Sequence, residues 1–185
     1  DITIAGTAAG SSPTRAGDCG GNTGITFPAP KTSYWNLAGA QSWSATGWAS
    51  SSGGAPAVNN FPLAQDTAVF DNTGSVTGTI TIDVAWNIGT FNASARTSAM
   101  TLNTGSSGQL FALYKDWKFG TGLTFSTSTG ALNFLKQGTQ TITSNGISFG
   151  VDLQLSHPTG MVQLADALTL GSTKGVSFNN SATFD

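Results

Sequence analysis

The chain contains no glutamate and few charged residues of either sign. Charged side chains make up 9% of its 185 residues, whereas roughly a quarter is usual in soluble domains. Its seven basic residues face nine aspartates, so the basic surface that a nucleic-acid-binding protein needs is missing. With only five lysines as well, the chain lacks the residues that cover the solvated faces of helices. The composition therefore argues against a helical protein and against a nucleic-acid partner.

Cysteine and histidine occur once each, which leaves no set of residues for a disulfide or a zinc site. Cys19, in the glycine-rich stretch GDCGGN, has no second cysteine to pair with. We interpret His157, in LSHPTG, as a surface group rather than a general base. Motifs such as a nucleophile elbow or a phosphate-binding loop are absent, and no apolar run approaches the roughly 18 residues of a transmembrane helix. We expect no enzymatic activity, no cofactor, no metal and no membrane insertion.

Threonine, serine and glycine are abundant and together supply 72 of the 185 residues. Threonine, isoleucine, valine and phenylalanine favour strands, while glycine and serine favour turns. From about residue 66 onwards, short stretches alternate apolar and polar residues, as in TITID (79–83) and GLTFST (122–127). Alternation with a period of two is typical of a strand with one buried face, so the sequence predicts an all-β fold.

The alternating stretches recur at similar spacings. Two series of inward-facing residues share successive shifts of 32 and 30 residues: Met100, Leu132 and Val162, and Phe91, Leu123 and Leu153. Coils that stack strand on strand produce such recurrences. We therefore predict a right-handed parallel β-helix, that is a β-solenoid, with three strands in each coil of about 30 residues. A β-sandwich, which shows the same alternation and similar turn spacing, is the alternative.

Three regions follow from this pattern. We interpret residues 1–32 as an N-terminal strand and a glycine-rich lead-in, residues 33–65 as an irregular Trp-rich lid, and residues 66–185 as the solenoid coils. The alternation continues through GVSFNN (175–180) near the C-terminus. Because the end of a solenoid exposes apolar side chains and unpaired strand edges, we expect these coils to belong to a longer chain or to be continued by a neighbouring subunit.

Three of the five tryptophans, Trp35, Trp43 and Trp48, lie within fourteen residues and are separated by small residues. One interpretation is a carbohydrate platform, because flat aromatic rings in polar loops stack on sugars. The other is a lid in which the same rings pack over the end of the apolar column, and we favour this structural role. Trp117, flanked by lysines in YKDWKF, is a fourth candidate for contact with a polysaccharide.

The Trp-rich region also resembles a segment that recurs in large virion structural proteins of tailed phages of marine bacteria. The matching features are a Tyr-Trp pair, a Trp-Ser step, a second tryptophan, a Ser-Ser-Gly-Gly run and a strand that ends in Phe-Asp: Tyr34-Trp35, Trp43-Ser44, Trp48, residues 51–54 and Phe70-Asp71. The stretches GDCGGNTGITFPAPK and IGTFNASARTSAMTL fit the same family, whereas WNLAGAQSW departs from its commoner Trp-Val-Gly-Gly turn. The resemblance implies β-solenoid coils displayed on an external appendage, and it assigns no catalytic or binding residue.

Together, the pattern and the resemblance predict a non-enzymatic virion structural protein, part of a tail fibre or similar appendage, which presents a host-recognition surface. Its expected location is the virion surface, outside the cell. The expected partners are other virion proteins, copies of itself (a homotrimer by analogy with other fibres) and host-surface polysaccharide. A bacterial cell-surface adhesin is the alternative. A polysaccharide lyase or hydrolase is a further alternative, which requires aspartates of different strands to cluster on one outer face: Asp83, Asp116, Asp152 and Asp166.

Overall fold

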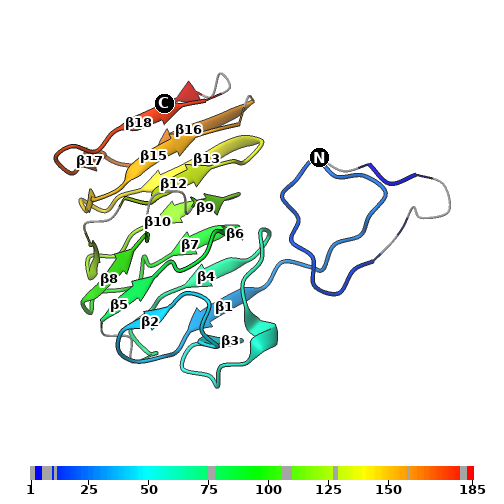
Figure 1. The fold of residues 1–185 in the computed structure, drawn as a ribbon, viewed down its shortest axis with the longest axis horizontal. Helices are drawn as coiled ribbons and strands as arrows, with labels where there is room; N and C mark the ends of the chain where they lie inside the picture. The colour runs from blue at the N-terminus through cyan, green and yellow to red at the C-terminus, as the bar shows by residue number, and fades with distance from the viewer. Residues whose placement is uncertain are drawn as a thin grey trace.

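The computed structural model is an all-β solenoid whose coils stack along one axis, from the cyan coil at the bottom of Figure 1 to the red coil at the top. It describes residues 3–5, 10, 12–74, 78–105, 110–126, 129–157, 159–179 and 183–185. Within these residues the only helix is the short 3-10 turn η2 (Val58–Asn60), and no helix is long and apolar enough to cross a membrane.

Successive strands of the chain lie on three faces of each coil, and strands on one face pair in parallel with those of the next coil. The first face is an eight-stranded sheet: β1 (Thr32–Trp35), β3 (Trp48–Ala49), β4 (Thr67–Val69), β7 (Thr90–Asn92), β10 (Trp117–Lys118), β13 (Gly138–Thr143), β16 (Gly160–Leu164) and β19 (Thr183–Phe184). A parallel β-helix with three strands per coil is thus confirmed, and a β-sandwich is excluded.

The other two faces complete each coil. One is a four-stranded sheet: β2 (Gln41–Ser42), β5 (Thr79–Thr81), β8 (Met100–Asn103) and β11 (Leu123–Phe125). In later coils the corresponding places in chain order are taken by the paired strands β14 (Ser148–Phe149) and β17 (Thr169–Leu170). The last face is a five-stranded sheet: β6 (Trp86–Ile88), β9 (Leu110–Leu113), β12 (Ala131–Phe134), β15 (Asp152–Leu155) and β18 (Val176–Phe178).

The coils are shorter than the predicted length of about 30 residues. Paired residues on neighbouring coils after β4 are 21 to 26 positions apart, as in Phe111 with Leu132 and in Phe91 with Trp117. The register predicted from the two series of inward-facing residues was therefore wrong.

The error in register has a simple geometric cause. Met100 lies in the four-stranded sheet, Leu132 in the five-stranded sheet and Val162 in the eight-stranded sheet. Each shift of about 30 residues therefore spans one coil plus one further face. The inward direction of these side chains was predicted correctly, because all three are buried.

Aromatic rings stack inside the coils along the solenoid axis. Phe70 stacks on Phe91 with ring centroids 5.1 Å apart, and Phe91 stacks on Trp117 at 4.0 Å. Parallel pairing causes this alignment, because it places Phe91 of one coil directly beside Trp117 of the next. Aromatic pairs of this kind contribute roughly 0.5–1.5 kcal/mol beyond the burial of their surface.

Aspartate side chains connect neighbouring coils at the turns. The Asp116 carboxylate accepts a hydrogen bond from the N–H of Thr141 at 3.0 Å, and that of Asp152 accepts one from Gly175 at 2.9 Å. In both cases the donor lies one coil further along the chain. The first contact is partly buried and the second is exposed, so these charge-assisted hydrogen bonds join the coils in addition to the pairing of their strands.

The Trp-rich region leaves the regular coil path between β1 and β4. Ser33 and Ala68 pair although they are 35 positions apart, because the intervening segment contains β2, β3 and η2. Strand β3 pairs with β1 in the antiparallel sense and forms the outer edge of the eight-stranded sheet. The region therefore lies across the first end of the stack, at the bottom of Figure 1.

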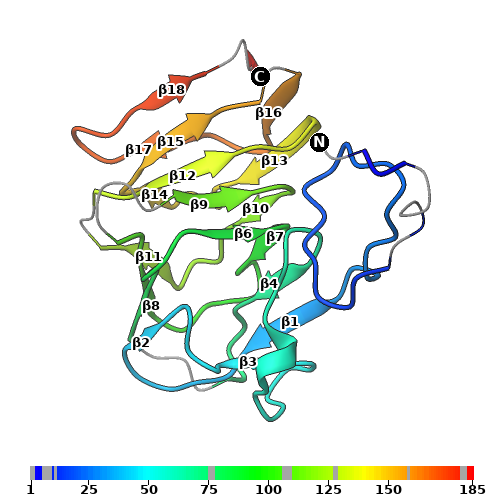
Figure 2. The same cartoon turned by 45° about the vertical axis from the view of Figure 1, so that its right-hand side comes forward.

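The N-terminal lead-in forms a loop beside the solenoid, drawn in blue in Figures 1 and 2. Its described residues contain one isolated parallel bridge, between Thr3 and Thr23, and the predicted N-terminal strand falls partly on residues 1, 2 and 6, which lie outside the described residues. The lead-in returns to the coils at Asp18, whose N–H donates to Gln65 Oε1 at 2.9 Å. Gln65 Nε2 in turn donates to the carbonyl of Ala16 at 3.2 Å, so residues 15–21 lie against the coils.

Candidate functional site

The four tryptophans singled out in the sequence lie in the core. Trp35, Trp43, Trp48 and Trp117 each have 0–1% of their surface exposed. The first three contact Phe70, with ring centroids 5.4 to 6.0 Å away. None of the four presents a ring face to solvent on which a sugar can stack. An aromatic ligand platform must therefore come from other rings.

The aspartates and the histidine are engaged in local contacts. Asp83 accepts hydrogen bonds from the N–H of Ser44, in the Trp-rich region, at 3.1 Å and from its hydroxyl. His157 Nδ1 accepts the N–H of Thr159 at 3.2 Å within its own turn. Among the described residues, no three His, Cys or Asp side chains form a group that could hold a metal ion.

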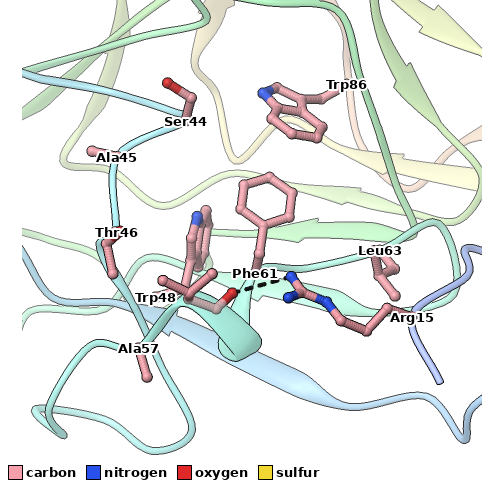
Figure 3. Close-up of a pocket in the computed structure, with 10 residues that line it drawn as sticks. Arg15, Ser44, Ala45, Thr46, Trp48, Ala57, Phe61, Leu63 and Trp86 are labelled. Carbon is pink, nitrogen blue, oxygen red and sulfur yellow. Dashed lines mark hydrogen bonds between the residues drawn. The ribbon is translucent and has the colours of Figure 1, made fainter.

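An aromatic hollow of about 290 Å³ lies where the Trp-rich region meets the next coil (Figure 3). Phe61 and Trp86, both half-buried, form its aromatic wall, with ring centroids 4.3 Å apart and planes tilted by 35°. The rim carries exposed groups of different chemistry: the Arg15 guanidinium, the Ser44 hydroxyl and the apolar Val58, which is 62% exposed. Apolar aromatic surface with a few polar groups at its edge is the usual composition of a small-ligand site.

The cation on the rim of the aromatic hollow is held in place by neutral partners. Arg15 donates to Asn59 Oδ1 at 2.9 Å and to the carbonyl of Val58 at 3.3 Å, a contact drawn as the dashed line in Figure 3. Neither acceptor cancels the charge of the guanidinium. The hollow therefore combines a ring surface with an oriented cation.

Two buried indole N–H groups adjoin the same hollow. Trp48 Nε1 and Trp86 Nε1 have no hydrogen-bond partner among the described residues, and in Figure 3 both nitrogens turn toward the space between Ser44 and Phe61. A buried donor without an acceptor costs roughly 1–3 kcal/mol. Trp43 and Trp117 have the same property within the core, so the feature alone marks no site.

Two further hollows continue the aromatic hollow along the same corner of the solenoid. One, of about 360 Å³, shares Trp86 with it, and the next, of about 430 Å³, shares Cys19 with the second. Residues 15–21 form the outer wall throughout, with Arg15 at the first hollow, Gly17 at the second and Gly21 at the third. We call the three hollows together the axial groove.

The third hollow is lined by basic side chains from consecutive coils. Lys115 follows β9 and Lys136 follows β12, and these strands pair directly. The Lys115 ammonium donates to the carbonyl of Gln65 at 2.9 Å, and that of Lys136 to the carbonyl of Thr139 at 2.6 Å. Both acceptors are neutral, so the two positive charges are oriented without being cancelled.

A phenol and a thiol meet in the third hollow. Burial raises the pKa of Tyr114 well above its ordinary value, and the hydrogen bond and charge interaction with Cys19 raise it further. Tyr114 therefore stays protonated at neutral pH and can act only as a neutral hydrogen-bonding group. The charge of the third hollow comes from its two lysines and from Asp18.

Sequence reasoning missed Trp86, Phe61 and Arg15 as site residues. Trp86 belongs to a strand with Ile88 buried, so its local pattern does not differ from that of a core position. Arg15 stands alone in a polar segment, and its place beside Phe61 depends on how the lead-in folds back on the coils. The one feature of the sequence that could have pointed to Trp86 is that this tryptophan lies outside both the Trp-rich region and YKDWKF.

Comparison with family models, curated proteins and solved structures finds no match for this chain. The geometry of the axial groove and the sequence resemblance described above are therefore the basis for a functional proposal.

Proposed function

We propose that the chain is a non-enzymatic recognition module of an external fibre, such as a phage tail fibre or a similar virion appendage, and that it binds host-surface polysaccharide in the axial groove. The observation that carries the proposal is the half-buried Phe61–Trp86 pair on the wall of the aromatic hollow, beside the oriented guanidinium of Arg15. The resemblance of the Trp-rich region to virion structural proteins supports the setting on a particle.

In this proposal the solenoid holds the side chains that contact the sugar in fixed positions. The sugar ring lays its apolar face on Trp86 and Phe61, while its hydroxyls meet the polar rim of the hollow. Because Trp86 belongs to a strand of the stack and both rings are half-buried, binding orders few side chains, which limits its entropic cost. Asp83 lies nearby but is already bonded to Ser44, and the recognition role assigns it no chemical step.

The binding proposal is tested by replacing the aromatic wall. The purified chain is measured against an immobilised panel of neutral and acidic polysaccharides, and Trp86→Ala and Phe61→Ala are compared with Phe178→Ala, which removes an exposed ring from the far end of the solenoid. We expect the two groove variants to weaken binding about tenfold, equivalent to about 1.4 kcal/mol, because one stacking surface is lost. Phe178→Ala should bind as the wild type does.

Two results would count against the proposal. If no polysaccharide of the panel binds, or if the groove variants bind as well as Phe178→Ala, the groove is not the recognition site. The proposed place on a virion appendage is tested separately, by cryo-electron microscopy of the assembly that contains the chain. Coils that project from a phage particle support the appendage proposal, whereas coils along a cell-surface filament favour an adhesin.

A further inference from the structure

The positive charge of this acidic protein is concentrated in the axial groove. Of seven basic side chains, three line the groove: Arg15, Lys115 and Lys136. Of the eight aspartates that the structure describes, Asp18 alone belongs to its lining. The formal net charge of the whole chain is −2, so the groove and the rest of the molecule differ in sign. Such an arrangement attracts an anion and orients it along the groove.

The groove lysines have no carboxylate partner in the described part of the chain, in contrast to Lys31, which forms an ion pair with Asp66. Lys115 and Lys136 each donate to a backbone carbonyl and keep further N–H groups for a ligand. Asp18 lies in the same hollow, but its Oδ1 already accepts hydrogen bonds from the N–H of Gly20 at 2.9 Å and from Asn22 at 2.8 Å. The third hollow therefore keeps a net positive charge.

The aromatic wall and the two lysines lie on successive coils of the solenoid. Trp86 pairs with Phe111, and Phe111 pairs with Leu132, so the groove residues near β6, β9 and β12 belong to three consecutive coils. Parallel strands lie about 4.8 Å apart, so the distance from the first to the third of these coils is about 10 Å. Lys115 and Lys136 each lie four residues beyond the strand partner of Trp86 in their own coil, which adds up to about 13 Å along the strands. An elongated ligand that contacts both sections must therefore run obliquely to the axis.

We propose that the axial groove binds an anionic polysaccharide, with a ring face on Phe61 and Trp86 and with its carboxylate or sulfate groups at Lys115 and Lys136. This inference rests on the polysaccharide-binding function proposed above and adds the charge and the direction of the ligand. Nucleic acid is the less suitable anion, because three cations are too few for a phosphate backbone to be followed over its length.

The test compares acidic and neutral probes on the intact chain. Polygalacturonate and ι-carrageenan oligosaccharides supply carboxylates and sulfates, and dextran oligosaccharides are the neutral probe. We expect the acidic probes to bind at least about tenfold more tightly at low salt and to lose this advantage at high salt, since screening weakens exposed charge pairs.

Matched variants separate charge from structure. The double substitution Lys115→Met and Lys136→Met should abolish the preference for acidic probes, whereas Lys118→Met, on β10 and outside the groove, should leave it unchanged. Lys115→Arg with Lys136→Arg keeps both charges and should keep the preference. If the double Met variant unfolds in circular dichroism, Lys136→Met alone serves instead, because its ammonium contacts the carbonyl of Thr139, an exposed residue of β13.

The outcomes distinguish this inference from the function on which it rests. If acidic and neutral probes bind equally, and Trp86→Ala still weakens both, the chain binds polysaccharide but the charge inference is wrong. If a short DNA duplex binds as tightly as the acidic oligosaccharides, the groove is a general anion site and the inference is also wrong. If no polysaccharide binds at all, both proposals fail.

Discussion

The first and last coils contain the same kind of alternating strand but bury their inward-facing residues to different extents. At the first end, Trp35, Trp43 and Trp48 are 0–1% exposed beneath their own segment and β3. At the other end, Phe178 of β18 is 52% exposed, and β18 forms the edge of the five-stranded sheet. The comparison shows that an alternating strand directs an apolar side chain inward, and that a neighbouring layer must cover this side chain to bury it.

The same difference appears in the rings that each end brings together. Trp43 lies within 4.9 Å of Trp48 and 4.7 Å of Phe111 between ring centroids, so it joins the Trp-rich region to the column. Phe178 has one ring contact in the described residues, with Phe184 at 6.2 Å. A ring with more ring contacts should therefore contribute more to the free energy of unfolding.

The largest expected effect therefore comes from truncating a ring at the first end. Trp43→Ala should lower the free energy of unfolding by about 3–5 kcal/mol, because it removes a fully buried indole and leaves a cavity. Phe178→Ala should change it by less than about 1 kcal/mol, since the ring is half in solvent already. Urea denaturation followed by circular dichroism measures both, and equal losses for the two variants would contradict the comparison.

The alternation of the strands was enough to predict the fold class and the direction of the side chains, as Met100, Leu132 and Val162 show. The coil length was not predictable in the same way, because the turns vary in length. Paired residues are 21 apart between Phe111 and Leu132 but 26 apart between Phe91 and Trp117. Because the three faces have similar sequences, a series that matches residues of one face with residues of the next face looks as regular as the true pairing.

The axial groove was beyond sequence reasoning for a related reason. Its aromatic section needs Trp86 and Phe61 to meet, and its wall needs residues 15–21 to lie against the coils. The contacts that fix this wall are made by Gln65 with Asp18 and Ala16, nearly fifty positions apart. No period or motif marks such a contact, because it depends on the fold of an irregular segment.

A second pair of variants compares buried and exposed carboxylates at the two ends. Asp66, near the first end, is 1% exposed and accepts hydrogen bonds from the N–H groups of Lys31 and Leu63 and from the Lys31 ammonium at 2.6 to 2.9 Å. Asp66→Ala should cost about 2–4 kcal/mol of unfolding free energy, because it leaves buried donors without an acceptor. Thermal and urea unfolding provide the measurement.

The matched control for Asp66 is Asp152, in β15 toward the other end. Its carboxylate accepts one N–H, from Gly175, in an exposed contact. Asp152→Ala should cost about 1 kcal/mol or less, as expected for one partly hydrated hydrogen bond. A loss as large as that of Asp66→Ala would show that coil-bridging carboxylates contribute equally wherever they lie.

The smallest expected effect is a pH dependence at the less covered end. Burial alone would raise the pKa of the Asp166 carboxyl, but hydrogen bonds from Ser144 and Asn145 outweigh it, so the pKa lies below its ordinary value. A carboxyl with a lowered pKa in the folded state stabilises the fold above its unfolded pKa, about 3.9 for aspartate. That contribution is lost as the pH falls through the folded-state pKa.

Melting temperatures of the wild type and of Asp166→Asn, recorded from about pH 6 to about pH 3, should therefore converge as the pH falls through the range in which aspartates titrate. The wild type is expected to be more stable at the upper end, because its charged carboxylate accepts the N–H groups of Ser144 and Asn145 at 2.7 and 2.6 Å. A constant difference over the whole range would mean that Asp166 acts through its shape and hydrogen bonding, and that its charge contributes nothing at this end of the solenoid.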